Sequence, residues 1–363
     1  MRRLCRGLTP LLGMVMLLLA GCSDSPDTVT GSDRDEKSSY PVTWRFALEE
    51  IEGSVQHRYA LELKDRIESI SDGNIVIDIF PYGSIGTSLQ LTDLAREGSV
   101  HLAFASPGHL ADVIPEVGVF TLHYLLSDDE NVNRDILASE ELVQLFREPY
   151  GEQNLKLLGF VPEGWIVWTA NKPLKRPEDF DGLAIRTMTS EIAAESYRAY
   201  GATPTPTPFS QVYSDLQLRR IDGQANPVFA IEEMGFYEVQ NTMTFARPAQ
   251  FVTSVVSNRS WFDGLPEDQR EWLENALDEV APLAYEVQAE LNARRLETIR
   301  ENSNINMVEL TEEERERFRK ASLPVRDSYA RIAGERGERI LDRLLTLVRE
   351  AEAKTPTPAS TDQ

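Results

Sequence analysis

Residues 182–200 read Gly182-Leu-Ala-Ile-Arg-Thr-Met-Thr-Ser-Glu-Ile-Ala-Ala-Glu-Ser-Tyr-Arg-Ala-Tyr200, and this stretch decides the fold class. Its apolar start, Leu183–Thr187, predicts a buried strand, and Glu191–Tyr200 has the spacing of a helix. The same alternation recurs along the chain on both sides of it. We therefore expect βα units, a largely parallel sheet and the α/β class.

The other expected elements follow the same two patterns. Predicted strands are Thr43–Leu48, Asn74–Phe80, His101–Ala105, Leu155–Val161, Trp165–Thr169 and Phe251–Ser257. Predicted helices are Val55–Ile70, Ser88–Glu97, Asn133–Phe146 and Phe209–Leu218.

One predicted helix is much longer than the rest. Residues 266–302 contain no internal glycine, and Pro282 is their one internal proline. At about 1.5 Å per residue the helix would be on the order of 50 Å long, more than the width of a small domain. It has to span two lobes, and Pro282 should kink or split it because proline removes a backbone donor.

The N-terminus predicts export. Three arginines precede a mostly apolar run, Leu11–Leu19, which is too short to span a bilayer, and Leu19-Ala-Gly-Cys22 follows. These residues resemble a bacterial lipoprotein signal over residues 1–21, which implies cleavage before Cys22 and lipidation of its thiol. The alternative is an ordinary secretory peptide with an incidental cysteine, and it also exports the chain.

Loss of this leader changes the charge and the cysteine count. It removes three arginines and no acidic residue, so the formal net charge falls from −22 to −25. Cys5 leaves with the leader and Cys22 would be acylated, so no intramolecular disulfide is expected. Such an acidic chain argues against binding nucleic acid or anionic headgroups, and we expect membrane contact only through the lipid.

Two segments have too few apolar residues to fold. Residues 22–40 are rich in Ser, Asp, Thr, Gly, Glu and Lys and predict a flexible tether, and residues 354–363 predict a disordered tail. One globular unit lies between them.

Arg186 and Asn226 are the main candidates for binding chemistry. A guanidinium at a strand end can hold a carboxylate with two parallel hydrogen bonds, and an amide forty residues later can complete the contact. Arg186 could instead pair with an acidic side chain of the chain itself. Asn226 precedes a proline and follows Asp222-Gly, so it could simply begin a turn.

Nothing in the sequence indicates catalysis, a metal or a cofactor. None of the four histidines has a second ligand at metal spacing, and no G-x-S-x-G or phosphate-binding glycine loop occurs. We therefore expect a binding protein with no enzyme activity.

Six motifs occur in one order along the chain. They are Tyr82-Gly-Ser-Ile-Gly, Ser106-Pro-Gly, Arg176-Pro-Glu-Asp-Phe-Asp-Gly-Leu-Ala-Ile-Arg, Gly201-Ala-Thr-Pro-Thr-Pro, Phe209-Ser-Gln-Val-Tyr and Asp222-Gly-Gln-Ala-Asn-Pro. Their order and spacing resemble the DctP-like solute-binding proteins of tripartite ATP-independent periplasmic (TRAP) transporters, from about Trp44 to Leu345.

The resemblance implies a two-lobed periplasmic-binding-protein fold with hinge strands and a long helix spanning both lobes. We expect lobe 1 over residues 41–163 and about 252–291, and lobe 2 over 164–251 and about 292–350. Such a protein closes over a small organic acid or zwitterion and delivers it to the TRAP permease subunits. A sensory or scavenging binding lipoprotein without that permease would have the same fold.

The resemblance also assigns roles to single residues. It implies that Arg186 grips the solute carboxylate and that Asn226 supports it. The prolines of 201–208 read as a rigid scaffold that aims Phe209 into the cleft. Trp165 and Trp168 are three apart on one expected strand and point to opposite faces, so one reaches the solute and the other is core; Trp165 is our candidate wall.

Two blocks, beginning at Trp44 and at Glu163, look closest to members that bind ectoine-type solutes. That likeness implies that Glu49 pairs with a cationic nitrogen inside an aromatic wall. Phe209 keeps an aromatic, Phe229 is a further candidate, and His109 stands where an aromatic is expected; Glu49 and Glu50 could equally be solvated at a strand end. Many relatives carry a second arginine at the position of Ile166, and its loss argues against solutes that need two cations.

Overall fold

The computed structural model describes residues 41–354. The predicted leader, Cys22, the tether and the tail beyond Lys354 lie outside this range. Within it no helix is long and apolar enough to cross a membrane.

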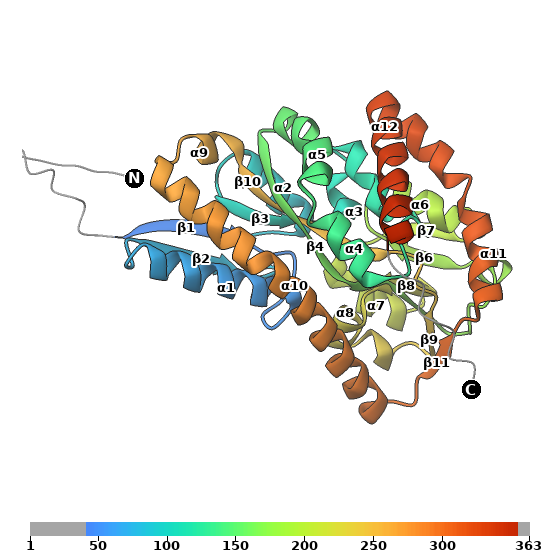
Figure 1. The fold of residues 1–363 in the computed structure, drawn as a ribbon. Coiled ribbons are helices and arrows are strands. Elements are labelled where there is room, and N and C mark those ends of the chain that lie inside the picture. The colour runs from blue at the N-terminus through green and yellow to red at the C-terminus, as the bar shows by residue number, and fades with distance from the viewer. Residues whose placement is uncertain (1–40, 355–363) are drawn as a thin grey trace, which may run out of the picture. The chain divides into compact units, whose positions relative to one another are not determined.

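The first sheet contains five strands in the order β2-β1-β3-β10-β4 (Figure 1). β1 is parallel to β2 and β3, whereas β10 is antiparallel to β3 and β4. The strands are Val42–Ala47 (β1), Ile75–Phe80 (β2), Leu102–Ala105 (β3), Leu155–Trp165 (β4) and Gln250–Asn258 (β10).

The second sheet contains six strands in the order β11-β9-β5-β8-β6-β7. β6 is parallel to β7 and β8, β11 is parallel to β9, and β5 is antiparallel to β8 and β9. The strands are Val167–Ala170 (β5), Ala184–Thr187 (β6), Thr203–Pro206 (β7), Gly223–Asn226 (β8), Thr242–Phe245 (β9) and Asn306–Glu309 (β11).

Antiparallel pairing arises where the chain crosses between the sheets, so the prediction of a largely parallel sheet is wrong there. β4 leads into β5 through Ile166 alone, and β9 leads back into β10 through residues 246–249. The two crossings run in opposite directions and are bonded together, since the Ile166 amide donates to the Ala249 carbonyl at 2.9 Å. These crossings are the predicted hinge strands.

Helices surround both sheets. The α-helices are Val55–Ile70 (α1), Ser88–Arg96 (α2), Pro107–Leu110 (α3), Glu130–Leu137 (α4), Glu140–Glu152 (α5), Glu191–Arg198 (α6), Val212–Gln217 (α7), Val228–Glu233 (α8), Arg259–Asp263 (α9), Glu267–Asn302 (α10), Glu312–Ser322 (α11) and Val325–Lys354 (α12). Short 3-10 turns are Pro115–Thr121 (η1), Pro177–Phe180 (η2), Phe209–Gln211 (η3) and Phe236–Glu238 (η4).

The long helix α10 is confirmed. It packs on α1 and β4 beside the first sheet and on α8 beside the second, so it spans both lobes (Figure 1). Pro282 does not split it. Pro282 and Asp278, whose carbonyl loses its backbone donor, are both exposed, so water can satisfy that carbonyl.

The predicted single helix Asn133–Phe146 is wrong, because two helices occupy the region. Ser139 separates them: its hydroxyl donates to the Ile136 carbonyl at 2.7 Å and accepts from the Leu142 amide at 3.2 Å. These bonds end α4 and cap the start of α5.

The C-terminal helix α12 contributes to the core of the first lobe. It breaks at Gly334, which has φ 68°, and buries Tyr329, Ile340 and Leu344 in the same apolar cluster as Phe146 of α5. α12 also packs on α6 of the second lobe. The sequence assigns 292–350 to the second lobe, and the lobe boundaries stay a prediction.

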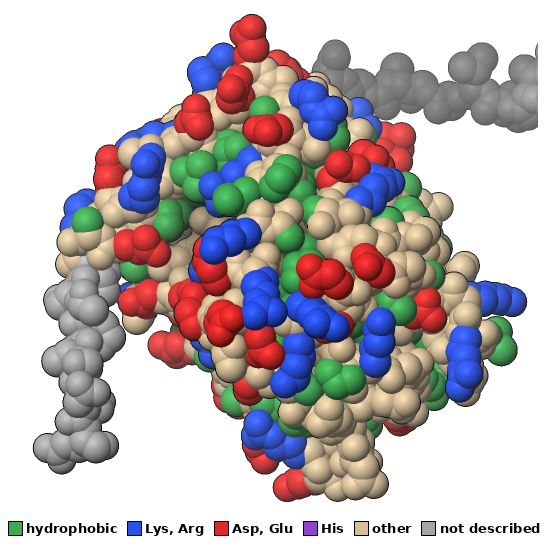
Figure 2. All heavy atoms as spheres, turned by 90° about the vertical axis from the view of Figure 1, so that its right-hand side faces the viewer, with side chains coloured by type: hydrophobic (Ala, Val, Ile, Leu, Met, Phe, Trp, Pro, Cys, Tyr) green, Lys and Arg blue, Asp and Glu red, His purple; other side chains and the backbone are tan. Residues whose placement is uncertain are grey.

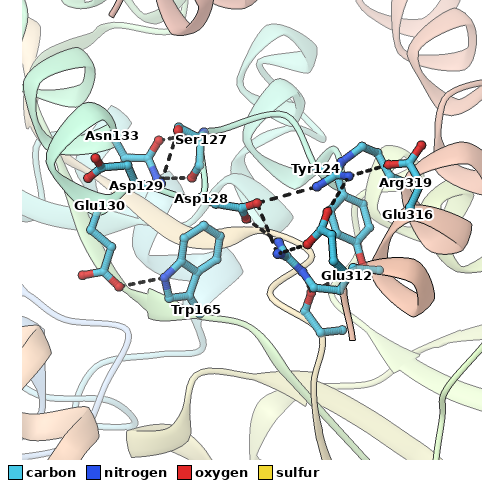
Figure 3. A network of polar contacts seen from close by, with 12 residues as sticks. Tyr124, Ser127, Asp128, Asp129, Glu130, Asn133, Trp165, Glu312, Glu316 and Arg319 are labelled. Carbon is cyan, nitrogen blue, oxygen red and sulfur yellow. Dashed lines mark hydrogen bonds and ion pairs between the residues drawn. The ribbon is translucent and has the colours of Figure 1, made fainter. Parts of the chain in front are cut away.

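Ion pairs join the loop before α4 to α11 (Figure 3). The Asp128 carboxylate bonds to Arg315, at 3.2 Å for one of its two contacts, and lies 3.6 Å from Arg319. Both guanidiniums lie near the Tyr124 ring, at 6.0 and 5.4 Å from its centroid. The face over α11 and α12 interleaves acidic and basic side chains (Figure 2), so on this side the net negative charge of the chain forms no acidic patch.

Candidate functional site

Arg186 and Asn226 lie on neighbouring strands near their carboxyl ends. Arg186 is the third residue of β6 and Asn226 is the last residue of β8, and these strands pair in parallel. Carboxyl ends of adjacent parallel strands form a common edge where ligands are bound. The structure therefore brings together the two residues that the sequence singles out.

Both side chains line a cavity between the two lobes, whose space of about 550 Å³ includes a part open to solvent. The first lobe contributes Glu49, Glu50, Ile51, Gln56, Ser88, Ser106 and His109, and the second lobe contributes Arg186, Met188, Phe209, Asn226, Pro227, Phe229, Ala230, Glu233 and Met234. Phe251 of the crossing strand β10 completes the wall. We call this space the first cavity.

Arg186 carries a buried charge without an anionic partner. It is 3% exposed, its Nε donates to the Thr207 carbonyl at 3.1 Å, and within residues 41–354 no carboxylate pairs with it. Burial lowers its pKa from 12.5 to about 10, so the guanidinium stays protonated at neutral pH. The alternative of an intramolecular ion pair is therefore not supported.

Asn226 is 7% exposed and donates to the Gln224 side chain. It also precedes Pro227, the N-cap residue of α8. Asn226 therefore both precedes the start of a helix and lines the cavity.

Aromatic rings flank the guanidinium. The Arg186 Cζ lies 5.8 Å from the centroid of the Phe209 ring, and Phe209 packs edge-on against Tyr82 of the other lobe at 5.8 Å. Phe229 lines the same cavity. The expectation that the proline-rich segment aims Phe209 into the cleft agrees with this position, and residues 203–206 form the edge strand β7.

His109 also lines the cavity and is neutral. Its Nδ1 lies 3.2 Å from the Thr189 hydroxyl, which belongs to the other lobe. Burial, and to a smaller extent the charge of Arg186, lower the His109 pKa to about 4. The imidazole can therefore donate or accept a hydrogen bond but adds no second positive charge.

Acidic side chains form the other end of the cavity. Glu49 is 6% exposed, and its Oε2 accepts a hydrogen bond from the Ser106 amide at 2.9 Å. Its Oε1 is buried without a partner among the described residues. Burial raises the Glu49 pKa to about 8, and the charge of Glu163 adds to the rise. The alternative that Glu49 and Glu50 are solvated at a strand end is wrong, since Glu50 is also 92% buried, with 8% exposure.

Three further polar residues were not identified from the sequence: Gln56 and Glu233, which line this end of the cavity, and Glu163, which is hydrogen-bonded to Gln56. Gln56 is fully buried; its Oε1 accepts from the Glu49 amide at 2.8 Å and its Nε2 donates to Glu163 at 3.0 Å. Burial raises the pKa of Glu163, and that of Glu233 to about 7. The helical period of α1 places Gln56 on the buried face with Tyr59 and Leu63. A polar residue on that apolar face could have identified Gln56 as a candidate from the sequence.

The structure does not bring Trp165 to the first cavity. Trp165 ends β4, and its indole donates to Glu130 at 2.7 Å in the network of Figure 3. Trp168 lies in β5 and is buried in the aromatic core of the second lobe. The premise of one strand carrying both tryptophans is wrong, because Ile166 marks the crossing between two sheets.

The lobes touch beside the cavity. The Ser190 amide donates to the Gly108 carbonyl at 2.9 Å, and the Ser210 amide donates to the Tyr82 hydroxyl at 3.2 Å. A Cβ on Gly108 would lie 2.2 Å from the Met188 Cε and 2.9 Å from its Cβ, so any other residue at 108 would require Met188 to move. The two lobes are therefore in direct contact in this structure.

Within the described residues no group of three His, Cys, Asp or Glu side chains could hold a metal ion. Two lobes joined by crossing strands, with an unpaired buried cation in the cavity they enclose, define a hinged binding protein.

Comparison with known proteins places this class in a family. The DctP model, bacterial extracellular solute-binding protein family 7, matches residues 46–332. The ectoine-binding periplasmic protein TeaA of Halomonas elongata is 34% identical over 308 residues, which cover 84% of this chain and 90% of TeaA. The ectoine/5-hydroxyectoine-binding periplasmic protein UehA of Ruegeria pomeroyi is 34% identical over 304 residues, covering 83% and 89%.

A solved structure gives the same result. The apo open TRAP periplasmic solute-binding protein from Marinobacter aquaeolei VT8 is 56% identical, with 84% of this chain and 100% of that chain covered and a TM-score of 0.80. The chain belongs to the DctP family of bacterial extracellular solute-binding proteins.

Proposed function

We propose that this chain is the extracytoplasmic receptor of a TRAP transporter and captures a small zwitterion with one carboxylate, of the ectoine type. The observation that carries the proposal is the charge distribution of the first cavity. A buried, unpaired arginine lies at one end, and buried glutamates lie at the other.

Each end has a definite partner in such a solute. Arg186 and Asn226 take the carboxylate, and the buried Oε1 of Glu49 takes the cationic nitrogen. Phe209 and Phe229 cover the ring faces. A dicarboxylate would place its second anion toward the buried carboxyl groups of Glu49 and Glu50, which offer it no positive charge.

The relatives TeaA and UehA, which are both named as ectoine-binding proteins, support this solute class. The name of a solved TeaA structure assigns it to a TRAP transporter, so the sensory or scavenging alternative is not favoured. Lipidation of Cys22 would hold the receptor at the membrane beside its permease, with residues 22–40 as the tether. That anchor is tested by mass spectrometry of the mature N-terminus.

The experiment for the solute uses the protein as purified. Mass spectrometry identifies any retained solute, and isothermal titration then compares ectoine, 5-hydroxyectoine, lactate, pyruvate and aliphatic amino acids. We expect a zwitterion to bind at least tenfold more tightly than lactate or pyruvate. Tighter binding of the simple acids would contradict the assignment of the acidic end, and a product formed from any solute would contradict a purely binding role.

A further inference from the structure

A second cavity, whose space of about 550 Å³ also includes a part open to solvent, shares three residues with the first: Arg186, Met188 and Phe251. The remaining lining residues are Pro107, Phe120, Thr121, His123, Ile166, Thr187, Ala193, Tyr197, Ala225, Ala249, Gln250 and Val252. Arg186 thus faces both cavities. A carboxylate held by its guanidinium would therefore lie next to both cavities.

Two buried polar side chains of the second cavity have no partner. Thr187 and Gln250 are each 4% exposed, and neither lines the first cavity. The Thr187 Oγ1 and the Gln250 Oε1 make no hydrogen bond within residues 41–354. Buried hydroxyl and amide groups are normally satisfied, so both positions call for a hydrogen-bonding group inside this cavity.

The rest of the wall is apolar or neutral. His123 is buried, its Nδ1 lies 2.8 Å from the Tyr200 hydroxyl, and burial lowers its pKa to about 3. Arg186 is the only charged group among the lining residues. Three alanines, at 193, 225 and 249, leave the space open. A charged substituent finds no counter-charge here beyond the guanidinium that the carboxylate already occupies, so the occupant is uncharged.

We propose that the second cavity is a subsite for an uncharged, hydroxyl-bearing substituent next to the solute carboxylate, with Gln250 and Thr187 as its hydrogen-bond partners. The inference rests on the proposed function, because Arg186 must hold the carboxylate. A hydroxyl both donates and accepts, which matches the carboxamide of Gln250 and the hydroxyl of Thr187. The solute then extends from the acidic end, past Arg186, into the second cavity.

The test uses two solutes that differ by one hydroxyl, ectoine and 5-hydroxyectoine. Titration calorimetry gives Kd for the wild type and for the near-isosteric variants Gln250→Leu and Thr187→Val. We expect each variant to weaken 5-hydroxyectoine by about tenfold and to change ectoine by less than about twofold, since only the hydroxylated solute loses a partner. Gln217→Leu, on the exposed face of α7, is the matched control and should change neither.

Three outcomes are decisive. A loss confined to 5-hydroxyectoine supports the subsite. Equal effects on both solutes, or none on either, overturn the subsite alone and leave water as the occupant of the second cavity. Failure of the wild type to bind either solute overturns the proposed function and this inference with it. Thermal unfolding of each variant without solute identifies any loss that comes from misfolding.

Discussion

At one end of the first cavity a guanidinium keeps its charge when buried, whereas at the other end carboxyl groups take up protons. Burial is the largest cause of both shifts, lowering the pKa of Arg186 to about 10 and raising that of Glu49 to about 8. The two ends differ because the ordinary pKa of arginine, 12.5, lies far above neutral pH, whereas that of glutamic acid, 4.5, lies below it. The guanidinium end is therefore permanently charged, and the carboxyl end is charged only when pH or a solute removes a proton.

Removal of the permanent charge should have the largest effect. Arg186→Ala leaves a buried carboxylate unpaired, and we expect affinity to fall by at least about 100-fold, or roughly 3 kcal/mol. Arg186→Lys keeps the charge but loses the planar fork, so its loss should be intermediate. Titration calorimetry with the identified solute measures both.

Arg198→Ala is the matched control, since Arg198 is exposed on α6 and pairs with Glu191 and Glu195. Its affinity should equal that of the wild type. If Arg186→Ala binds the solute as tightly as the wild type does, Arg186 does not hold the solute.

Neutralising the other end should have a smaller effect. Glu49→Gln keeps an acceptor for the Ser106 amide but cannot become an anion, so zwitterion affinity at pH 8.5 should fall by roughly 10- to 100-fold. Exposed Glu52→Gln, three residues away, is the control and should change nothing. An unchanged Kd in Glu49→Gln would show that the solute cation lies elsewhere.

The raised pKa of Glu49 predicts that a proton is released when a zwitterion binds. Below pH 8 the free protein holds a proton on Glu49 that a cationic nitrogen must displace, so affinity should fall as pH drops. We expect a loss of up to about tenfold between pH 8 and 7 and a flatter profile in Glu49→Gln. Titrations at pH 7 in phosphate and in Tris should differ in enthalpy by the number of protons released times the difference between the ionisation enthalpies of the two buffers. Identical enthalpies would contradict the exchange.

The smallest expected effect is on the stability of the free protein. Because folding raises the pKa of Glu49 from 4.5 to about 8, its contribution to stability is complete below pH 4.5 and is lost as pH rises through 8. The Tm without solute should therefore fall by roughly 6 °C between pH 5 and 8.5. Glu49→Gln should reduce that fall, and Glu52→Gln should retain it, in scanning calorimetry.

The sequence predicts the guanidinium end of the site better than the end formed by the buried carboxyl groups. Arg186 lies near the end of the apolar stretch that was predicted as a strand and forms β6. Asn226 was singled out as its partner, although the strand that carries it, β8, was not predicted. Glu163 reaches the site through the crossing strand β4, and its partner Gln56 lies 107 residues away. That contact depends on tertiary packing, which no local period encodes.

The same contrast explains the elements that were predicted correctly and incorrectly. The bounds of α1, Val55–Ile70, agree with the prediction because its apolar period and its cap at Ser54 are local. The antiparallel pairing of β4 and β10 depends on which way each crosses the hinge. Trp165 was misplaced for the same reason, since the alternation of faces assumed there fails where one sheet gives way to the other.

The contact at Gly108 bears on how long a captured solute stays. Its carbonyl bonds to Ser190 only while the lobes are together, and Met188 fills the space that any side chain at 108 would need. We therefore expect a side chain at position 108 to disturb this contact and to speed release of the solute. A receptor that must hand its solute onward depends on that dwell time.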